Sequence, residues 1–435
     1  MYQKYLFLAF VFFLFSPKDY AQEQSVYIKA GKLYDSKENV LLDNKAIEVQ
    51  GKRVIAIIDQ KSIPANQEVI DLSAYTVLPG LIDAHTHVLF SQEASDDFAE
   101  HSVHTIIMEN DALRVLRGAK RAESYLYAGI TSIKDLGNSG LFLDVALRDA
   151  IDEGTVIGPR IFAVGQILAA AGGQIYGVPA NHQAIIDKEY RIIHDVEDAK
   201  DAVREHVNQR VDLIKICADN IPNNTHLTVE EMTAIVKIAH SYNLTVTAHS
   251  ITNQSAWNAA RAGVDGIEHG FNLADSTLAL MSEKGIYLVP TENSRNYMLR
   301  YADLVGYSKE EQQWIESYLA NMNNRFKRAM GQGVTIVAGS DNYTQINGIS
   351  RGESSKDMLR VYFEFGMKPL DILQSATYIS AQSFNKESEI GRIAPNAFAD
   401  IIAVKGDLSE NFLEAMEDVV FVMKDGTVYL NETGH

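Results

Sequence analysis

The middle of the chain alternates short apolar segments of strand length with longer amphipathic stretches. In the longer stretches the apolar positions recur with a helical period, as they do from Thr228 to Ala239. This alternation is typical of βα units, whose strands form a parallel sheet. Eight such units predict a (β/α)8 barrel, in which functional groups lie at the carboxyl ends of the strands. The eight predicted strands are Leu81–His87, Ile130–Asp135, Arg160–Val164, Leu213–Cys217, Thr245–His249, Gly266–His269, Ile286–Pro290 and Thr335–Gly339.

Both ends of the chain have a different pattern, with short alternating segments separated by glycine turns. The stretch from Gln24 to Tyr75 has this pattern, and so does the end of the chain, where Asp425-Gly426 marks a hairpin. We therefore expect the two ends to form one small β-sandwich domain. The predicted boundaries are a signal peptide at 1–21, sandwich strands at 22–78 and 386–435, and the barrel at 79–385.

The first residues have the features of a secretory signal. Lys4 precedes an apolar run from Tyr5 to Phe15, and a small residue, Ala21, follows. The run is shorter than the roughly 18 residues of a membrane-spanning helix, so we expect no stable anchor after cleavage. The mature protein is therefore expected in the periplasm or outside the cell.

Composition narrows the function classes. The chain has 435 residues and a formal net charge of -18, which disfavours binding to nucleic acid or to an anionic membrane. Its one cysteine, Cys217, excludes an intrachain disulfide, so the fold depends on a large core. The sequence does not determine the oligomeric state, and a homo-oligomer is one alternative.

Six side chains that can bind a metal or carry a proton lie at the predicted strand ends. His85 and His87 are two apart, so on a strand they share a face and can hold one divalent ion. Taken singly, each residue has a structural alternative: a packed histidine, a capping aspartate or a lysine paired with an acid. All six converge on one face of the barrel, which favours a metal site. The other four are Lys215, His249, His269 and Asp341.

These motifs resemble the metal-dependent amidohydrolase superfamily, and in particular its imidazolonepropionase-like and prolidase-type dipeptidase branch. The resemblance rests on Pro79–His87, on Ile267-Glu268-His269-Gly270 and on the tail from Ala376 to Asp400. It implies two divalent ions, with His85, His87 and Asp341 on one ion and His249 and His269 on the other. Lys215 would bridge them as an N-carboxylated lysine, since an ammonium would repel cations. Zinc suits the histidine-rich set, and manganese would also fit.

The implied reaction is hydrolysis of an amide C–N bond. Two ions about 3.5 to 4 Å apart lower the pKa of a shared water and polarise a carbonyl. Asp341 is expected to take the water's proton and return it to the leaving nitrogen. A dipeptide or an N-acyl amino acid is the preferred small-molecule substrate, with a cyclic amide or lactam as the second choice. A noncatalytic binding protein and a one-metal, deaminase-like site are two further hypotheses for the same barrel.

The chain departs from its relatives around the predicted mouth of the barrel. Where many relatives have Gly-Gly-His after the third strand, this chain has Gly172-Gly173-Gln174, and Ile251 replaces a frequent tyrosine or histidine. The segment 165–197 is expected to be a loop over the mouth. Candidate substrate contacts are Gln174, Tyr176, Arg295, Tyr297 and Tyr343, with Arg295 a possible anchor for a carboxylate.

Overall fold

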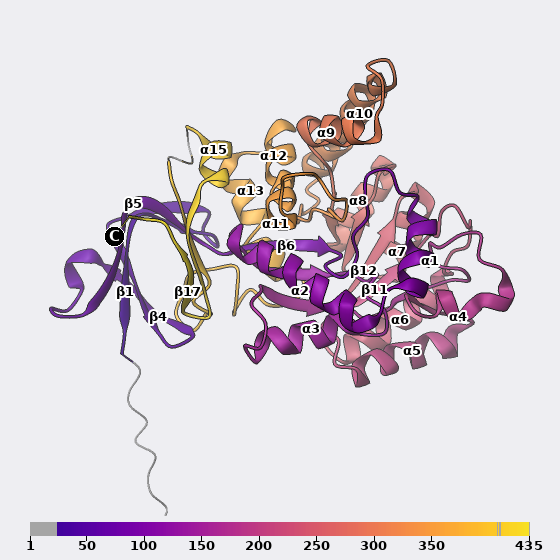
Figure 1. Cartoon of the computed structure of the whole chain (residues 1–435), viewed down its shortest axis with the longest axis horizontal. Helices are drawn as coiled ribbons and strands as arrows, with labels where there is room; N and C mark the ends of the chain where they lie inside the picture. The colour runs from indigo at the N-terminus through magenta and orange to yellow at the C-terminus, as the bar shows by residue number, and fades with distance from the viewer. Residues whose placement is uncertain (1–23, 407, 409, 435) are drawn as a thin grey trace, which may run out of the picture.

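The computed structural model describes residues 24–434 apart from 407 and 409, so the predicted signal peptide lies outside the described residues. A β domain made from both ends of the chain packs against a larger α/β barrel (Figure 1). This arrangement confirms the predicted fold class. No helix within the described ranges is both long and apolar enough to cross a bilayer.

The barrel consists of two parallel sheets that are joined by hydrogen bonds. One sheet contains β6, β7 and β8, and the other has the order β10-β9-β11-β12-β13-β14. Asp212 N donates to Ala163 O at 2.8 Å, which joins β8 to the segment before β11. The strands are β6 (Leu81–Thr86), β7 (Ile130–Asp135), β8 (Arg160–Ala163), β9 (Ile167–Ala169), β10 (Tyr190–Ile192), β11 (Ile214–Cys217), β12 (Val246–Ser250), β13 (Gly266–His269) and β14 (Tyr287–Val289).

The eighth predicted strand, 335–339, closes the barrel through individual hydrogen bonds rather than as a regular strand. Val337 N donates to Leu288 O on β14, and Ala84 N on β6 donates to Ala338 O, both at 2.9 Å. The third predicted strand, 160–164, agrees with β8 to within one residue, and just beyond it Gly165 takes a positive φ of 71° before a further strand, β9. The segment 165–197 is therefore not a simple loop: it contains β9, a short helix and β10.

Helices cover the outside of the barrel and carry its apolar core on their inner faces. The predicted capping box of Thr228 and Glu231 is present at the start of α6. The helices are α1 (Phe98–Met108), α2 (Asp111–Tyr127), α3 (Leu143–Asp152), α4 (Gln183–Ile186), α5 (Val196–Asn208), α6 (Val229–Ser241), α7 (Asn253–Ala262), α8 (Asp275–Lys284), α9 (Arg295–Val305), α10 (Trp314–Gly331), α11 (Arg351–Ser355), α12 (Asp357–Glu364), α13 (Pro369–Ser375), α14 (Tyr378–Gln382) and α15 (Phe412–Glu417). Three 3-10 turns lie at Gln60–Ser62, Ala180–His182 and Glu311–Gln313.

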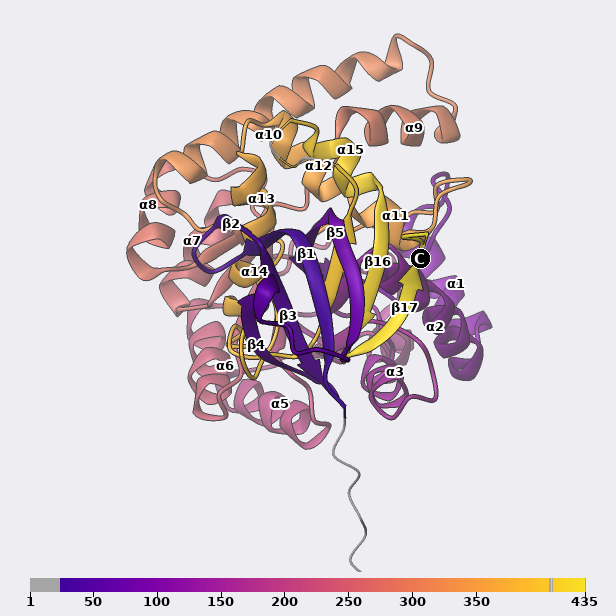
Figure 2. The ribbon, with the colours of Figure 1, turned by 90° about the vertical axis from the view of Figure 1, so that its left-hand side faces the viewer.

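The β domain is one continuous eight-stranded sheet, seen face-on in Figure 2, rather than two separate sheets. Its order is β17-β16-β15-β5-β1-β3-β4, with β2 on β1, and the pairing of β5 with β15 joins the two chain ends. A separate apolar core, which includes Ile28, Leu72 and Phe421, stabilises it. The strands are β1 (Val26–Asp35), β2 (Val40–Asp43), β3 (Lys45–Gln50), β4 (Arg53–Asp59), β5 (Glu68–Pro79), β15 (Ile401–Val404), β16 (Val419–Lys424) and β17 (Thr427–Asn431).

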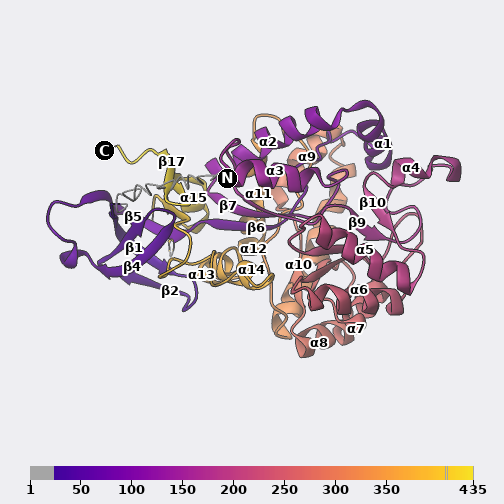
Figure 3. The ribbon, with the colours of Figure 1, turned by 90° about the horizontal axis from the view of Figure 1, so that it is seen from below.

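The β domain is fixed to the barrel by backbone continuity and by buried polar contacts. β5 runs directly into β6 through Gly80, whose N–H donates to Asp400 O at 2.9 Å (Figure 3). Arg160 of β8 reaches into the β domain, where it pairs with Asp425 at 2.6 Å and lies 3.9 Å from the centre of the Phe398 ring. The strand that carries His85 is therefore held at its amino end by the β domain.

A close helix contact gives the first prediction. A Cβ added at Gly352 of α11 would lie 2.2 Å from the carbonyl oxygen of Ser124 on α2. Gly352→Ala should therefore lower the free energy of unfolding by about 1–3 kcal/mol, measured by urea denaturation. Gly331→Ala is the control, because a Cβ at Gly331 meets no atom within 4 Å and should be neutral or slightly stabilising. Equal stabilities for the two variants would contradict close packing of α11 on α2.

Candidate metal centre

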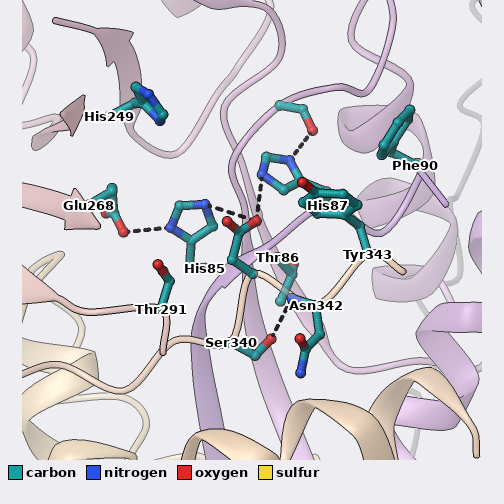
Figure 4. A network of polar contacts seen from close by, with 12 residues as sticks. His85, Thr86, His87, Phe90, His249, Glu268, Thr291, Ser340, Asn342 and Tyr343 are labelled. Atoms are coloured by element: carbon teal, nitrogen blue, oxygen red, sulfur yellow. Dashed lines mark hydrogen bonds and ion pairs between the residues drawn. The ribbon is translucent and has the colours of Figure 1, made fainter. Parts of the chain in front are cut away.

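The six predicted side chains all line one cavity of about 260 Å³ at the carboxyl ends of the barrel strands. The imidazole rings are close neighbours: the ring centres of His85 and His87 are 5.3 Å apart, those of His85 and His269 5.0 Å, and those of His249 and His269 4.6 Å. Figure 4 shows His85 and His87 near the middle of this group, with His249 to one side. The structure thus brings together residues from separate parts of the chain.

One part of the centre consists of His85, His87 and Asp341, whose ligand atoms all lie within 4.8 Å of one another. Asp341 Oδ1 is 3.4 Å from His87 Nε2 and 3.6 Å from His85 Nε2. His87 Nδ1 donates to Gly137 O at 2.7 Å, and this bond leaves Nε2 with a free lone pair. A hydrogen bond from the far ring nitrogen commonly orients a metal-bound histidine in this way.

The donor set fits a divalent cation. His85 Nε2 and Asp341 Oδ1 are buried, and neither has a hydrogen-bond partner within the described chain. Leaving such atoms unpaired is costly, and a cation between them would satisfy both. Burial also lowers the pKa of His85, which favours the neutral form that binds metals.

The other part of the centre contains His249, His269 and Lys215. In the part of the chain that the structure describes, only the group of His85, His87 and Asp341 brings three histidine, cysteine or carboxylate ligands together. Asp219 Oδ1 lies 3.5 Å from His249 Nε2 and Asp341 Oδ2 lies 3.7 Å from His269 Nδ1, but neither carboxylate forms a three-ligand group with both histidines. Lys215 lines the same cavity. Lys215 is 2 % exposed, and burial lowers its pKa, which favours the uncharged amine.

Glu268 contacts His85 of the centre, and the site predicted from the sequence did not include Glu268. Glu268 Oε2 lies 2.7 Å from His85 Nδ1, and Thr247 Oγ1 donates to Oε1. Burial alone would raise the pKa of Glu268, but His85, Lys215 and Lys134 lower it to about 2, so the carboxylate stays ionised. Glu268 belongs to the Ile267–Gly270 motif, and this is the one sequence feature that pointed to it.

The local backbone explains how Glu268 and His269 both reach the centre. Adjacent strand residues normally point to opposite faces. His269 has a positive φ of 67°, so the chain turns at the end of β13. His269 Nδ1 then contacts the hydroxyl of Thr291 at 2.8 Å, and Thr291 is a second supporting residue that the sequence did not indicate.

Glu268→Gln provides a test of this support. The change keeps the shape of the side chain but removes the charge that faces His85, and we expect metal affinity to fall about 10- to 100-fold. Competition with a chelator, followed by metal analysis, measures the affinity. Glu283→Gln, on the exposed face of α8, is the control and should leave affinity unchanged. An affinity in Glu268→Gln equal to that of the wild type would show that the carboxylate does not tune the site.

The predicted substrate contacts divide into two groups. Gln174, Tyr176 and Tyr343 line the cavity, and Gln174 Nε2 lies 3.0 Å from His249 Nε2. Arg295 and Tyr297 do not line it. The expectation that Arg295 anchors a substrate carboxylate is therefore corrected.

The position of Arg295 has a local cause. It is the first residue of α9, and its Nε pairs with Glu316 of α10 at 2.6 Å on the exposed outer surface. Tyr297 is buried on the inner side of the same helix.

Cys217, which shares a strand face with Lys215, is also buried, and burial raises the pKa of its thiol to about 12.

The chain is similar to several known proteins over most of its length. The sequence profile of the Amidohydrolase family matches residues 76–430. The chain is 25 % identical to ochratoxinase from Aspergillus niger, over 89 % of this chain and 83 % of that protein. It is 21 % identical to imidazolonepropionase from Fusobacterium nucleatum, over 87 % of this chain and 92 % of that protein. Among solved structures, that of a Xaa-Pro dipeptidase with bound methionine matches with a TM-score of 0.79 and 28 % identity, over 94 % of this chain and 100 % of that chain.

Proposed function

Because this chain belongs to the amidohydrolase family and is a hydrolytic enzyme acting on carbon–nitrogen bonds, we propose that it cleaves a small amide with the help of two divalent ions. The observation that carries the proposal is a pair of buried atoms, His85 Nε2 and Asp341 Oδ1, which lie 3.6 Å apart in the cavity and have no hydrogen-bond partner among the described residues. A packed structural histidine would have its ring nitrogens paired. A noncatalytic protein is less well supported, because all six positions retain metal-binding or proton-transfer groups.

Each ion has its own set of side chains in this proposal. His85, His87 and Asp341 would hold one ion, and His249 and His269 the other. Lys215 would supply a ligand shared by both ions: its neutral Nζ would add to the carbon of carbon dioxide and release one proton to solvent water, which gives a carbamate with two oxygen donors. The lowered pKa of Lys215 supports this step, because the uncharged amine is the reactive form.

In this proposal Asp341 transfers the proton of the attacking water. Bound divalent ions acidify a water molecule and polarise a substrate carbonyl. Burial would raise the pKa of Asp341, but His85 and His87 lower it below its usual value, so the carboxylate is ionised at neutral pH. Asp341 can therefore accept the proton of the attacking water and return it to the leaving nitrogen as the C–N bond breaks.

For the substrate we propose a dipeptide or an N-acyl amino acid. The likeness to a Xaa-Pro dipeptidase structure and to ochratoxinase supports this class. A cyclic amide or lactam is the second candidate, and it is favoured by the likeness to imidazolonepropionase. Zinc is the proposed metal because of the four histidines.

One experiment tests the whole proposal. The protein is produced with added bicarbonate, its metal content is measured, and it is then assayed on dipeptides, N-acyl amino acids and lactams. We expect two ions per chain and hydrolysis of at least one class. One ion per chain would favour a deaminase-like site. Two ions without any hydrolysis would argue against the proposed substrates.

We also propose that the protein is exported to the periplasm or secreted, on the basis of the apolar run that follows Lys4. Sequencing the amino terminus of the protein isolated from its own cells tests this. An intact Met1 would contradict export with cleavage.

A further inference from the structure

Three aromatic rings form a wall on the His87 side of the cavity. We call Phe90, Phe98 and Tyr343 the aromatic wall, and all three line the cavity. The ring centres of Phe90 and Phe98 are 5.5 Å apart, those of Phe90 and Tyr343 also 5.5 Å, and those of Phe98 and Tyr343 6.2 Å. Figure 4 shows Phe90 and Tyr343 beside His87, on the side of the centre away from His249.

A buried arginine holds the aromatic wall in place. Arg351 is 8 % exposed, and its guanidinium donates to Tyr343 O at 2.8 Å and to Phe90 O at 3.3 Å. Phe98 is fixed differently: it is the first residue of α1, and the preceding Asp97 caps that helix and accepts a hydrogen bond from Tyr176 at 2.6 Å. The wall is therefore preorganised, which lowers the entropy cost of binding a flat ligand.

Apart from the six candidate metal ligands, the residues that line the cavity are uncharged. Among the described residues that line the cavity, Lys215 is the one lysine or arginine, and it lies at the base among the metal ligands. Ile167, Ile221 and Pro222 add apolar surface. Asp97 places a carboxylate at the mouth through its contact with Tyr176. A negatively charged substituent would find no protein cation to pair with on the wall and would meet an acidic group near the mouth.

We infer that the aromatic wall is a specificity subsite for an uncharged aromatic or bulky apolar substituent of the amide substrate. This inference rests on the proposed amide hydrolysis and narrows its substrate class. The rings offer edge-to-face and stacking contacts to such a group. The cavity volume of about 260 Å³ lies near the lower end of ligand pockets and limits the substrate to a small molecule.

Two matched series of N-acyl amino acids test the inference. The first keeps the amino acid constant and varies the acyl group among phenylacetyl, acetyl and succinyl. The second keeps acetyl constant and varies the amino acid among phenylalanine, alanine and aspartate. We expect one series to show kcat/KM about tenfold or more higher for the aromatic member than for the small member, with the acidic member lowest. A preference for the acidic member, or no preference in either series, would overturn the inference.

Equilibrium binding separates this inference from the proposed hydrolysis. The dissociation constants of benzamide and acetamide are measured on the metal-loaded Asp341→Asn protein, which is designed to bind without turnover. Tighter binding of benzamide by about tenfold supports the subsite even if none of the six acyl amino acids is cleaved. Equal binding of the two amides rejects it even if the enzyme is an active amidase.

Variants of the wall provide the residue-level test. Phe98→Ala should lower the ratio of kcat/KM for the aromatic over the small substrate about tenfold, because one ring contact is lost. Tyr343→Phe retains the ring and should keep the ratio. Phe363→Ala is the control, since Phe363 is 40 % exposed on α12 and stacks on Phe412 away from the cavity. An unchanged ratio in Phe98→Ala would contradict the assignment of the wall.

Discussion

Lys215→Ala is expected to lose metal and hydrolytic activity together. Without a bridging carbamate, no histidine, cysteine or carboxylate among the described residues completes a three-ligand group with both His249 and His269, so the metal content should fall from two ions to one or fewer per chain. We expect kcat/KM to fall by more than about 100-fold, because even a group that only hydrogen-bonds to a metal ligand is worth 10- to 100-fold. Metal analysis and steady-state kinetics on the same preparation measure both effects.

Rescue by small carboxylic acids distinguishes the loss of a bridging carboxylate from other effects of the Lys215→Ala change. Acetate or propionate can enter the space left by the side chain and supply two oxygen ligands, so each should restore part of the metal content and of the activity. Lys215→Met fills most of the space without a carboxylate and should not be rescued. Lys120→Ala, which is on the surface of α2, should behave as the wild type. Full metal content and activity in Lys215→Ala without any added acid would rule out the bridge.

Asp341→Asn is expected to separate metal binding from proton transfer. Asparagine retains one oxygen that faces His85 and His87 but cannot accept the proton of the attacking water. We therefore expect kcat to fall by about 10²- to 10⁴-fold while most of the metal stays bound, the size usually seen when a general acid/base is removed. The measurements are kcat on the best substrate of the screen and the metal content of the purified variant.

The fold has to be intact for this result to be informative. Asp341 has a positive φ of 52°, a conformation that asparagine tolerates well, and its N–H donates to His85 O at 2.8 Å in either case. Asp152→Asn, at the exposed end of α3, is the matched surface control. A kcat within a factor of two of the wild type would mean that another group moves the proton.

The positions of the candidate metal ligands could be predicted from the sequence because they depend on local periodicity. His85 and His87 are two apart at the carboxyl end of β6, which ends at Thr86, and parallel strands present their carboxyl ends on one face of a barrel. Lys215, His249 and His269 belong to strands β11, β12 and β13, which the apolar pattern located correctly. The structure accordingly brings all six residues to the same cavity.

The residues around the ligands could not be predicted in the same way. Strand alternation would direct Glu268 away from the side that carries His269, and only the turn at His269 allows both to reach the centre. Arg295 was assigned to the mouth because it follows a strand end, but the start of α9 directs it toward Glu316. Loop paths depend on contacts between distant segments, and the pattern of apolar positions contains no information about them.

The order of the strands and helices and the face on which the candidate metal ligands lie follow from the amino-acid pattern, because periodicity and side-chain type are local properties. The class of chemistry follows from the resemblance of the motifs to the amidohydrolase superfamily. The shape of the cavity is a tertiary property. Phe90, Phe98 and Tyr343 form one wall because Arg351 binds two backbone carbonyls from separate loops and Asp97 caps α1 beside Tyr176. These contacts join residues that are remote in the chain, so they exist only once the barrel has closed.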